Sequence, residues 1–157
     1  MSELSAGDRA QDFELPTGPD ETVSLSGVLS GNHYAVVIFF PAVWSRPCSN
    51  EASIIEAVAD EIRRLGAEIV GIATDNYPAT RAWAEKLGLS FPIASDFEPK
   101  GAVAKQWGVY HEAGTCKRVQ FIVDSDREVV LSHVAPIGKS PGAQAILKKL
   151  EELSARG

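Results

Sequence analysis

The chain has 157 residues, of which 45% are hydrophobic and 23% charged, and this length predicts a single domain over residues 1–157. A net charge of −6 offers no basic surface for nucleic acid, and no apolar run is long enough to cross a membrane. The first residues lack the charged and then apolar profile of a signal peptide, which predicts a cytoplasmic protein.

The first half of the chain predicts a β-hairpin followed by a β-α-β unit. Residues 13–15 and 22–25 are expected to form short strands, because a segment rich in proline, glycine and acidic residues separates them. Residues 36–40 are consecutive apolar residues, which is typical of a strand buried on both faces of a sheet. Apolar residues then recur at helical spacing over 49–65, before a strand over 68–73. Because such a crossover joins parallel strands, the core of the sheet should be parallel.

The second half predicts further helices and strands and a final helix. The elements expected in it are helices over 78–87 and 99–106, a short strand over 91–94, and antiparallel strands over 118–123 and 128–131. The last helix should begin at Ser140, with Pro141 at its first helical position. The order of these elements predicts an α/β protein with a thioredoxin-like fold, in which helices flank a central mixed β-sheet and an added β-hairpin lies at the N-terminus.

Cys48 lies where the buried strand ends and the following helix begins. A helix N-terminus carries unpaired N–H groups and a partial positive charge, and both favour a thiolate over a neutral thiol. The thiolate is the nucleophilic form of cysteine. The alternative is that Cys48 fills the core as a small apolar side chain. The polar, proline-containing turn formed by Pro41, Ser45, Arg46 and Pro47 argues for a reactive residue instead.

The spacing within this turn matches a sequence signature. Pro41-x-x-x-Ser45-x-x-Cys48, followed by Glu51, resembles the active-site signature of the peroxiredoxins, P-x-x-x-[T/S]-x-x-C. Further segments resemble blocks of this family in the same order, namely 71–75, 95–97, 101–109 and 118–124. The resemblance covers most of the chain, and the segment 95–124 is most similar to the one-cysteine branch that includes alkyl hydroperoxide reductase E.

The resemblance implies a catalytic role for four residues. Cys48 would be the nucleophile that attacks the peroxide and passes through a sulfenic acid. Ser45 would place a hydroxyl near the sulfur that donates to the peroxide oxygens, and Pro41 would shape and dry the pocket. Arg118, at the R-x-x-F position of the family, would stabilise the thiolate and hold the peroxide.

Three further residues have supporting or open roles. Glu51 suits the dipole of the helix and is expected to pair with Arg118 or another arginine, and Trp44 is expected to form a wall of the pocket. Cys116 fits no position at which the family places a resolving cysteine, but in a strand it would point to the same side as Arg118. We expect a one-cysteine mechanism, with Cys116 as the alternative resolving residue.

The implied activity is that of a thiol-dependent peroxidase, which reduces hydrogen peroxide and small organic hydroperoxides. No cofactor is implied, and the scattered His33, His111 and His133 do not have the spacing of metal ligands. The expected partners are the peroxide, a second copy of the chain in a homodimer, and an external thiol reductant. That reductant would be a thioredoxin-, glutaredoxin- or mycoredoxin-like protein or a low-molecular-weight thiol.

Two alternative functions remain on the same residues. Residues 44–48 (WSRPC) also resemble the thioredoxin motif W-C-x-P-C with its first cysteine replaced by serine, which would make the protein a disulfide-handling or binding module. Thioredoxins have a proline just before the later strand that faces the active site, and no proline precedes Arg118 here. The other alternative is a redox sensor that uses Cys48 without efficient peroxide turnover.

Overall fold

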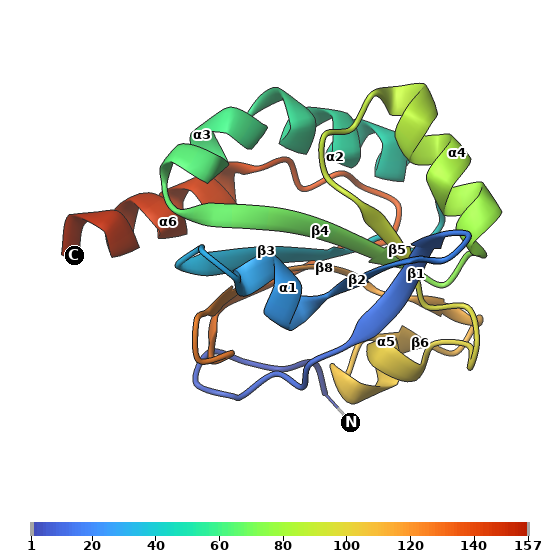
Figure 1. Ribbon diagram of the computed structural model, residues 1–157, viewed down its shortest axis with the longest axis horizontal. Helices are drawn as coiled ribbons and strands as arrows, with labels where there is room; N and C mark the ends of the chain where they lie inside the picture. Colours follow the sequence, from blue (N-terminus) through green and yellow to red (C-terminus); the bar gives the residue numbers. More distant parts are fainter. Residues whose placement is uncertain (1, 157) are drawn as a thin grey trace.

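The computed structural model describes residues 2–156 and shows a central sheet covered on both faces (Figure 1). Its strands are β1 (Glu14–Gly18), β2 (Glu21–Ser24), β3 (Tyr34–Phe39), β4 (Ala67–Ala73), β5 (Ile93–Ser95), β6 (Tyr110–His111), β7 (Thr115–Cys116), β8 (Arg118–Asp124) and β9 (Val129–Ala135). Its helices are α1 (Leu25–Leu29), α2 (Arg46–Ala57), α3 (Ala59–Arg64), α4 (Tyr77–Leu87), α5 (Ala102–Gln106) and α6 (Gln144–Arg156).

The central sheet has the strand order β5-β4-β3-β8-β9. Strands β3, β4 and β5 run parallel, whereas β8 is antiparallel to β3 and β9 is antiparallel to β8. In the middle strand, Val37 pairs with Val70 on one side and Phe121 on the other. The prediction of a mixed sheet with a parallel core, preceded by a hairpin formed by β1 and β2, is therefore confirmed.

The side chains of β3 alternate between two apolar layers, because successive residues of a strand point to opposite faces. Val36 and Ile38 pack in the layer formed with α2, α3, α4 and α6. Val37 and Phe39 pack in the layer that includes residues of the hairpin, α1 and α5. All four are fully buried, and each such side chain contributes about 1.5–3 kcal/mol of hydrophobic free energy. A strand with no solvent-facing side must be apolar throughout, which explains its sequence.

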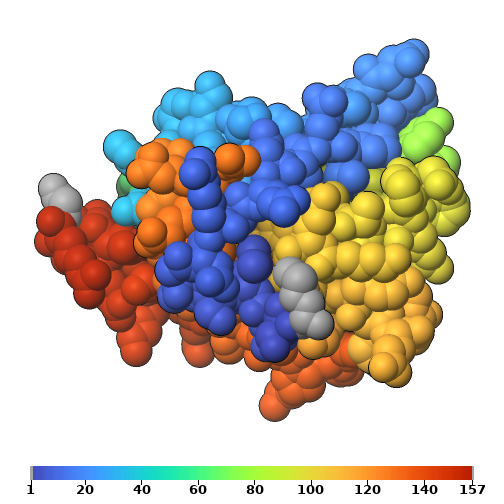
Figure 2. All heavy atoms as spheres, turned by 90° about the horizontal axis from the view of Figure 1, so that it is seen from below, coloured from blue at the N-terminus to red at the C-terminus, as the bar shows by residue number. Residues whose placement is uncertain are grey.

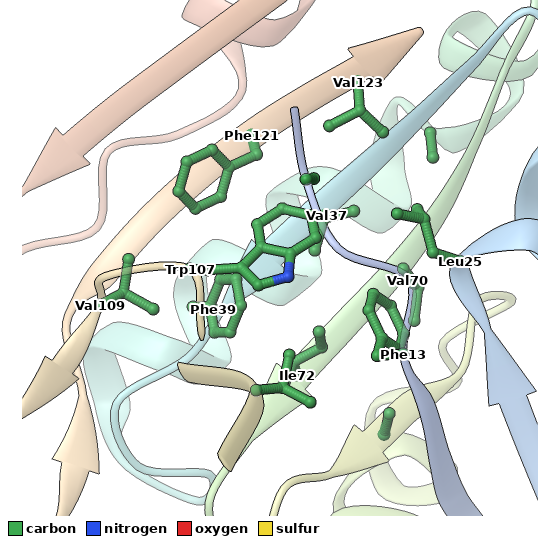
Figure 3. Close-up of a cluster of buried hydrophobic side chains, with 14 of the residues drawn as sticks. Phe13, Leu25, Val37, Phe39, Val70, Ile72, Trp107, Val109, Phe121 and Val123 are labelled. Carbon is green, nitrogen blue, oxygen red and sulfur yellow. The ribbon is translucent and has the colours of Figure 1, made fainter. Parts of the chain in front are cut away.

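Trp107 lies at the centre of the second layer, where its indole is surrounded by aromatic side chains (Figure 3). Its ring centroid lies 5.7 Å from that of Phe39 and 5.1 Å from that of Phe121, in tilted and edge-to-face arrangements. Edge-to-face aromatic pairs add stabilisation beyond the area that they bury. Trp107 is therefore a core residue of this face of the sheet.

The N-terminal segment closes this layer from outside, and Figure 2 shows it lying across the face that carries residues of α5 and β9. The Leu4 N–H donates to the Trp107 carbonyl at 3.1 Å, and the Gly7 N–H donates to the Val129 carbonyl at 2.9 Å. These bonds satisfy backbone groups that would otherwise be left at the edge of the core.

Several elements differ from those predicted from the sequence. The helix expected over 49–65 begins earlier, at Arg46, and is divided into α2 and α3 at Val58, whose backbone (φ −112°, ψ 12°) is not helical. The short helix α1 and the small β6–β7 hairpin were not predicted, because α1 has five residues and each strand of the hairpin has two, which is too few to show a periodic pattern there.

The last helix begins at Gln144, so the prediction that it starts at Ser140 is wrong. Gly142 has a φ of 70°, in the left-handed region, and its carbonyl accepts a hydrogen bond from the Gln120 side chain at 2.8 Å. This bond to β8 holds the chain in a non-helical conformation, although a serine followed by proline is a typical helix start. The segment before α6 thus contacts β8 next to Arg118.

Candidate active site

The turn between β3 and α2 places Cys48 in the first turn of a helix. The connecting loop includes Trp44, whose φ of 71° lies in the left-handed region. Ser45 caps the helix, because its Oγ accepts a hydrogen bond from the Cys48 N–H at 3.4 Å. Pro47 occupies an early helical position, where a missing N–H breaks no helical hydrogen bond. The Cys48 side chain is fully buried, with 0% of its surface exposed.

The Ser45 hydroxyl makes its hydrogen bonds within the loop. It donates to the Ala42 carbonyl at 2.7 Å while it accepts from the Cys48 N–H. The sequence led us to expect this hydroxyl to donate to a peroxide, but here its hydrogen is already used. A hydroxyl oxygen has two lone pairs, so Ser45 can still accept a hydrogen bond from a peroxide.

Arg118 opens β8, the strand beside β3, and its guanidinium reaches the cysteine. Its Nη1 lies 3.4 Å from the Cys48 Sγ and 2.8 Å from the Glu51 Oε1. Its Nε donates to the carbonyls of Pro136 and Ile137, at 3.2 Å and 3.0 Å, and its Nη2 also donates to Ile137. Only 1% of the arginine surface is exposed. The planar guanidinium is therefore held on both sides, with one edge toward the sulfur and the carboxylate.

Glu51 is one turn along α2 from Cys48, and its carboxylate is divided between two partners. One oxygen pairs with Arg118, and the other accepts from the Gln120 Nε2 at 2.9 Å. Gln120 was not predicted from the sequence. Its position two residues after Arg118 in a strand places it on the same face of the sheet, and this was the available signal.

Burial and pairing act in opposite directions on the two charged side chains. Burial raises the pKa of Glu51, and the hydrogen bonds from Gln120 and Arg118 only partly offset this rise. For Arg118, burial alone would lower the pKa, but the bond to Glu51 and the nearby Cys48 raise it overall. The guanidinium therefore stays charged, and the sulfur and the carboxylate share one cation.

Pro41 and Trp44 differ in burial, because Pro41 is buried and Trp44 is exposed. Pro41 lines an open surface pocket with Asp75, Phe97 and Lys100, and neither Cys48 nor Arg118 lines that pocket. Trp44 was expected to form a wall of the catalytic pocket, but 54% of its surface is exposed. Its indole N–H donates to the Ala79 carbonyl of α4 at 3.2 Å. Trp44 therefore covers the outside of the loop.

Cys116 packs in the other apolar layer from Cys48, so the expectation that it would face the same way as Arg118 is wrong. The strand that carries Arg118 begins at that residue, and Cys116 belongs to the separate β7. Its thiol donates to the Phe40 carbonyl at 3.1 Å and packs in the apolar layer around Trp107. Burial, followed by the nearby Cys48, raises the pKa of the Cys116 thiol well above its ordinary range. Cys116 is thus a buried, protonated thiol.

Beyond these thiols and charged groups, two other features concern residues 2–156 of the chain. No group of three or more histidine, cysteine, aspartate or glutamate side chains in this part of the chain is arranged to hold a metal ion. None of the helices described there is long and apolar enough to span a bilayer. The chemistry that this site offers comes from a thiol, a guanidinium and a carboxylate.

Comparisons with known proteins point to one family. Residues 6–132 match the AhpC/TSA family. The chain is 32% identical over 122 residues to alkyl hydroperoxide reductase E of Mycobacterium tuberculosis, which covers 77% of this chain and 79% of that protein. It is 30% identical over 136 residues to peroxiredoxin Bcp of Escherichia coli, with coverage of 82% and 85%. The crystal structure of the peroxidoxin BcpB from Mycobacterium tuberculosis matches with a TM-score of 0.84 and 31% identity, over 96% of this chain and 98% of that chain.

Proposed function

Because the chain belongs to the AhpC/TSA family, the peroxiredoxins, we propose that its thiol-dependent peroxidase reaction takes place at Cys48, with Pro41, Ser45 and Arg118 around it. The observation that carries this proposal is the 3.4 Å contact between the Arg118 Nη1 and the Cys48 Sγ in a buried site. A guanidinium at that distance stabilises a thiolate and the negative charge that develops on a peroxide oxygen. The family match also disfavours the thioredoxin-like alternative.

The reaction is a displacement at oxygen. The Cys48 thiolate attacks one oxygen of hydrogen peroxide or an organic hydroperoxide, so that an S–O bond forms and the O–O bond breaks. The second oxygen leaves as hydroxide or alkoxide and takes up a proton, which gives water or an alcohol. The sulfur is oxidised to a sulfenic acid. Arg118 contacts the sulfur throughout, while Ser45 accepts a hydrogen bond from the peroxide.

Burial of the site favours small peroxides as substrates. Cys48 has no exposed surface and Arg118 has 1%, so a peroxide reaches the sulfur only by displacing neighbouring atoms of the chain. Hydrogen peroxide and short hydroperoxides need the smallest displacement. Exclusion of water also strengthens the interaction between Arg118 and the reacting atoms.

We further propose a one-cysteine mechanism in which an external thiol resolves the sulfenic acid. This thiol condenses with the sulfenic acid to a mixed disulfide with loss of water, and a second thiol then releases Cys48 as its thiol. Cys116 is a poor candidate for the first step, because its raised pKa keeps it protonated and its thiol packs in the other apolar layer from Cys48. The identity of the reductant and a cytoplasmic location stay predictions from the sequence.

Replacing Cys116 with serine tests this mechanism. We expect Cys116→Ser to consume hydrogen peroxide within about twofold of the wild-type rate in the presence of excess dithiothreitol, because the external thiol performs the resolving step. A serine hydroxyl can also donate to the Phe40 carbonyl, so the fold should be retained. Peroxide consumption measured by its absorbance checks this expectation. An intramolecular disulfide between Cys48 and Cys116 in the oxidised wild type would contradict it.

We also propose that the protein forms a homodimer through the surface around Trp44 and Phe97. These aromatic residues are 54% and 44% exposed, and aromatic side chains are enriched in interfaces. They are neighbours, because Trp44 donates to the Ala79 carbonyl and Phe97 lines one pocket with Ala79. Sedimentation equilibrium should give twice the mass of one chain.

The variant Phe97→Glu should sediment as a monomer, because it places a charged carboxylate where an apolar ring would be buried in this interface. Ile54 is similarly exposed but lies on α2, outside the pocket that Phe97 and Ala79 line. Ile54→Glu is therefore the matched control and should stay dimeric. A wild-type protein with the mass of one chain at micromolar concentration would rule out this assembly.

A further inference from the structure

Gln120 is a buried polar residue that the proposed reaction does not use. It lies in β8 on the face that carries Arg118, and 1% of its surface is exposed. Both hydrogens of its Nε2 are used, one toward the Glu51 Oε2 at 2.9 Å and the other toward the Gly142 carbonyl at 2.8 Å. These two acceptors also fix the orientation of the amide, because a flipped amide would place its oxygen against both.

We propose that Gln120 is a positioning residue for the peroxidase reaction, which holds the Glu51 carboxylate and the chain before α6 so that Arg118 stays against the Cys48 sulfur. The inference rests on the proposed function, since it concerns how fast Cys48 reacts.

The Glu51 carboxylate is oriented by two partners, one for each oxygen. A carboxylate held by a single partner can rotate about its last torsion, which has broad preferences. Here one oxygen is held by Arg118 and the other by Gln120. The plane of the carboxylate is thereby fixed, and with it the position of the Arg118 Nη1 that also contacts the sulfur.

The chain before α6 is held by the same strand that carries Gln120. Arg118 donates to the carbonyls of Pro136 and Ile137, and Gln120 donates to the carbonyl of Gly142. Both ends of this short segment are therefore bonded to β8, at positions two residues apart. Loss of the Gln120 bond would release one end and disturb the carbonyls that orient Arg118.

Gln120 is a neutral donor, so it supports the ionised form of Glu51 by a hydrogen bond. It adds no second cation that would compete with Arg118 for the carboxylate. In the described part of the chain, the Gln120 Oε1 is buried without a hydrogen-bond partner. An unpaired buried acceptor is destabilising, and an apolar residue of similar size would avoid that cost. A side chain that serves only to fill the core would not need this amide.

The variant Gln120→Met tests the proposal, because methionine keeps the length of the side chain and removes the donor. We expect the second-order rate constant for oxidation of Cys48 by hydrogen peroxide to fall about tenfold at pH 7. The pH profile of this rate constant should also shift, because the ionisation of Glu51 moves to a higher pH than in the wild type. Without Gln120, the pKa of Glu51 rises further, so the carboxylate takes up a proton nearer to neutral pH. Stopped-flow tryptophan fluorescence at pH 5 to 9 measures both effects.

Two controls separate positioning from general destabilisation. Ile122→Val alters a fully buried residue on the same face of β8 and should lower stability without changing the rate by more than about twofold. In the double variant Gln120→Met/Glu51→Gln, the shifted ionisation should vanish, because no carboxylate is left to titrate. A wild-type rate and pH profile in Gln120→Met would overturn the positioning role. So would a shifted ionisation that persists in the double variant.

The failure of this inference is distinct from failure of the proposed function. If wild-type Cys48 does not react with hydrogen peroxide, the assignment of the reaction to Cys48 fails, and the role of Gln120 falls with it. If the wild type reacts and only the Gln120 variants show no effect, the proposed function stands and the positioning role alone is wrong. Should Gln120→Met fail to fold, Gln120→Thr, with a β-branched side chain suited to a strand, is measured with the same two outcomes.

Discussion

In the variant Arg118→Met, hydrogen peroxide is expected to oxidise Cys48 on the order of 10²–10³ times more slowly than in the wild type at pH 7. The guanidinium lies 3.4 Å from the sulfur, in a site from which water is excluded, so its charge acts there with little screening. Methionine fills much of the space but carries neither charge nor donors. Stopped-flow measurement of Cys48 oxidation gives the rate constant.

Two further variants separate the charge of Arg118 from its set of donors and from the loss of an arginine elsewhere. Arg118→Lys keeps the charge but loses the planar set of donors that reaches Glu51 and Ile137, so its rate should be intermediate. Arg63→Met removes an arginine that pairs with Glu68 away from the site and should leave the rate unchanged. An Arg118→Met rate equal to that of the wild type would remove Arg118 from the mechanism.

The variant Glu51→Leu should lower the free energy of unfolding by about 3 kcal/mol at pH 7. The ion pair between Glu51 and Arg118 is fully buried, with a 2.8 Å contact. Removal of the carboxylate leaves the buried Arg118 cation without this partner. Glu51→Gln keeps an oxygen toward Arg118 and should cost less. Urea unfolding measures the difference, and a Glu51→Leu protein as stable as the wild type would show that the pair contributes nothing to stability.

The pKa of Glu51 also predicts how this difference changes with pH. Burial raises the pKa above the ordinary value of 4.5, so above that pH the folded protein still binds a proton that the unfolded chain has released. The wild-type free energy of unfolding therefore falls as the pH rises from 4.5 through the raised pKa. The variant Glu51→Gln has no carboxyl group at this position, so its free energy of unfolding does not fall for this reason. The wild-type advantage over Glu51→Gln should be larger at pH 4 than at pH 8, and an advantage that grows with pH would contradict the assignment.

The parts of the site that sequence could predict are local in the chain. Ser45, Cys48 and Glu51 lie within seven consecutive residues, and their spacing alone indicates a capped helix start with a cysteine in its first turn. Arg118 required the resemblance to a family, because nothing in its neighbourhood points to a residue 70 positions earlier. Gln120 was missed, since its partners in α2 and before α6 come together only in the folded chain.

The errors also have physical causes. Cys116 was placed by strand alternation, but the chain leaves the β6–β7 hairpin at Lys117 before β8 begins, so the alternation does not continue across that point. The start of α6 was placed by a strong local signal, Ser140 followed by Pro141, which a tertiary hydrogen bond from Gln120 overrides. The central strands were predicted correctly, because complete burial requires an apolar sequence that few other elements share.

The central claim is that Cys48 reacts with peroxide and that Cys116 does not take part. Intact mass and free-thiol count after one equivalent of hydrogen peroxide, with a sulfenic-acid trap present, test it most directly on the wild type and Cys116→Ser. We predict one trapped sulfenic acid at Cys48 in both proteins and no disulfide in the wild type. A Cys48 that stays a free thiol would contradict the claim. Loss of both thiols in the wild type alone would instead make Cys116 the resolving residue.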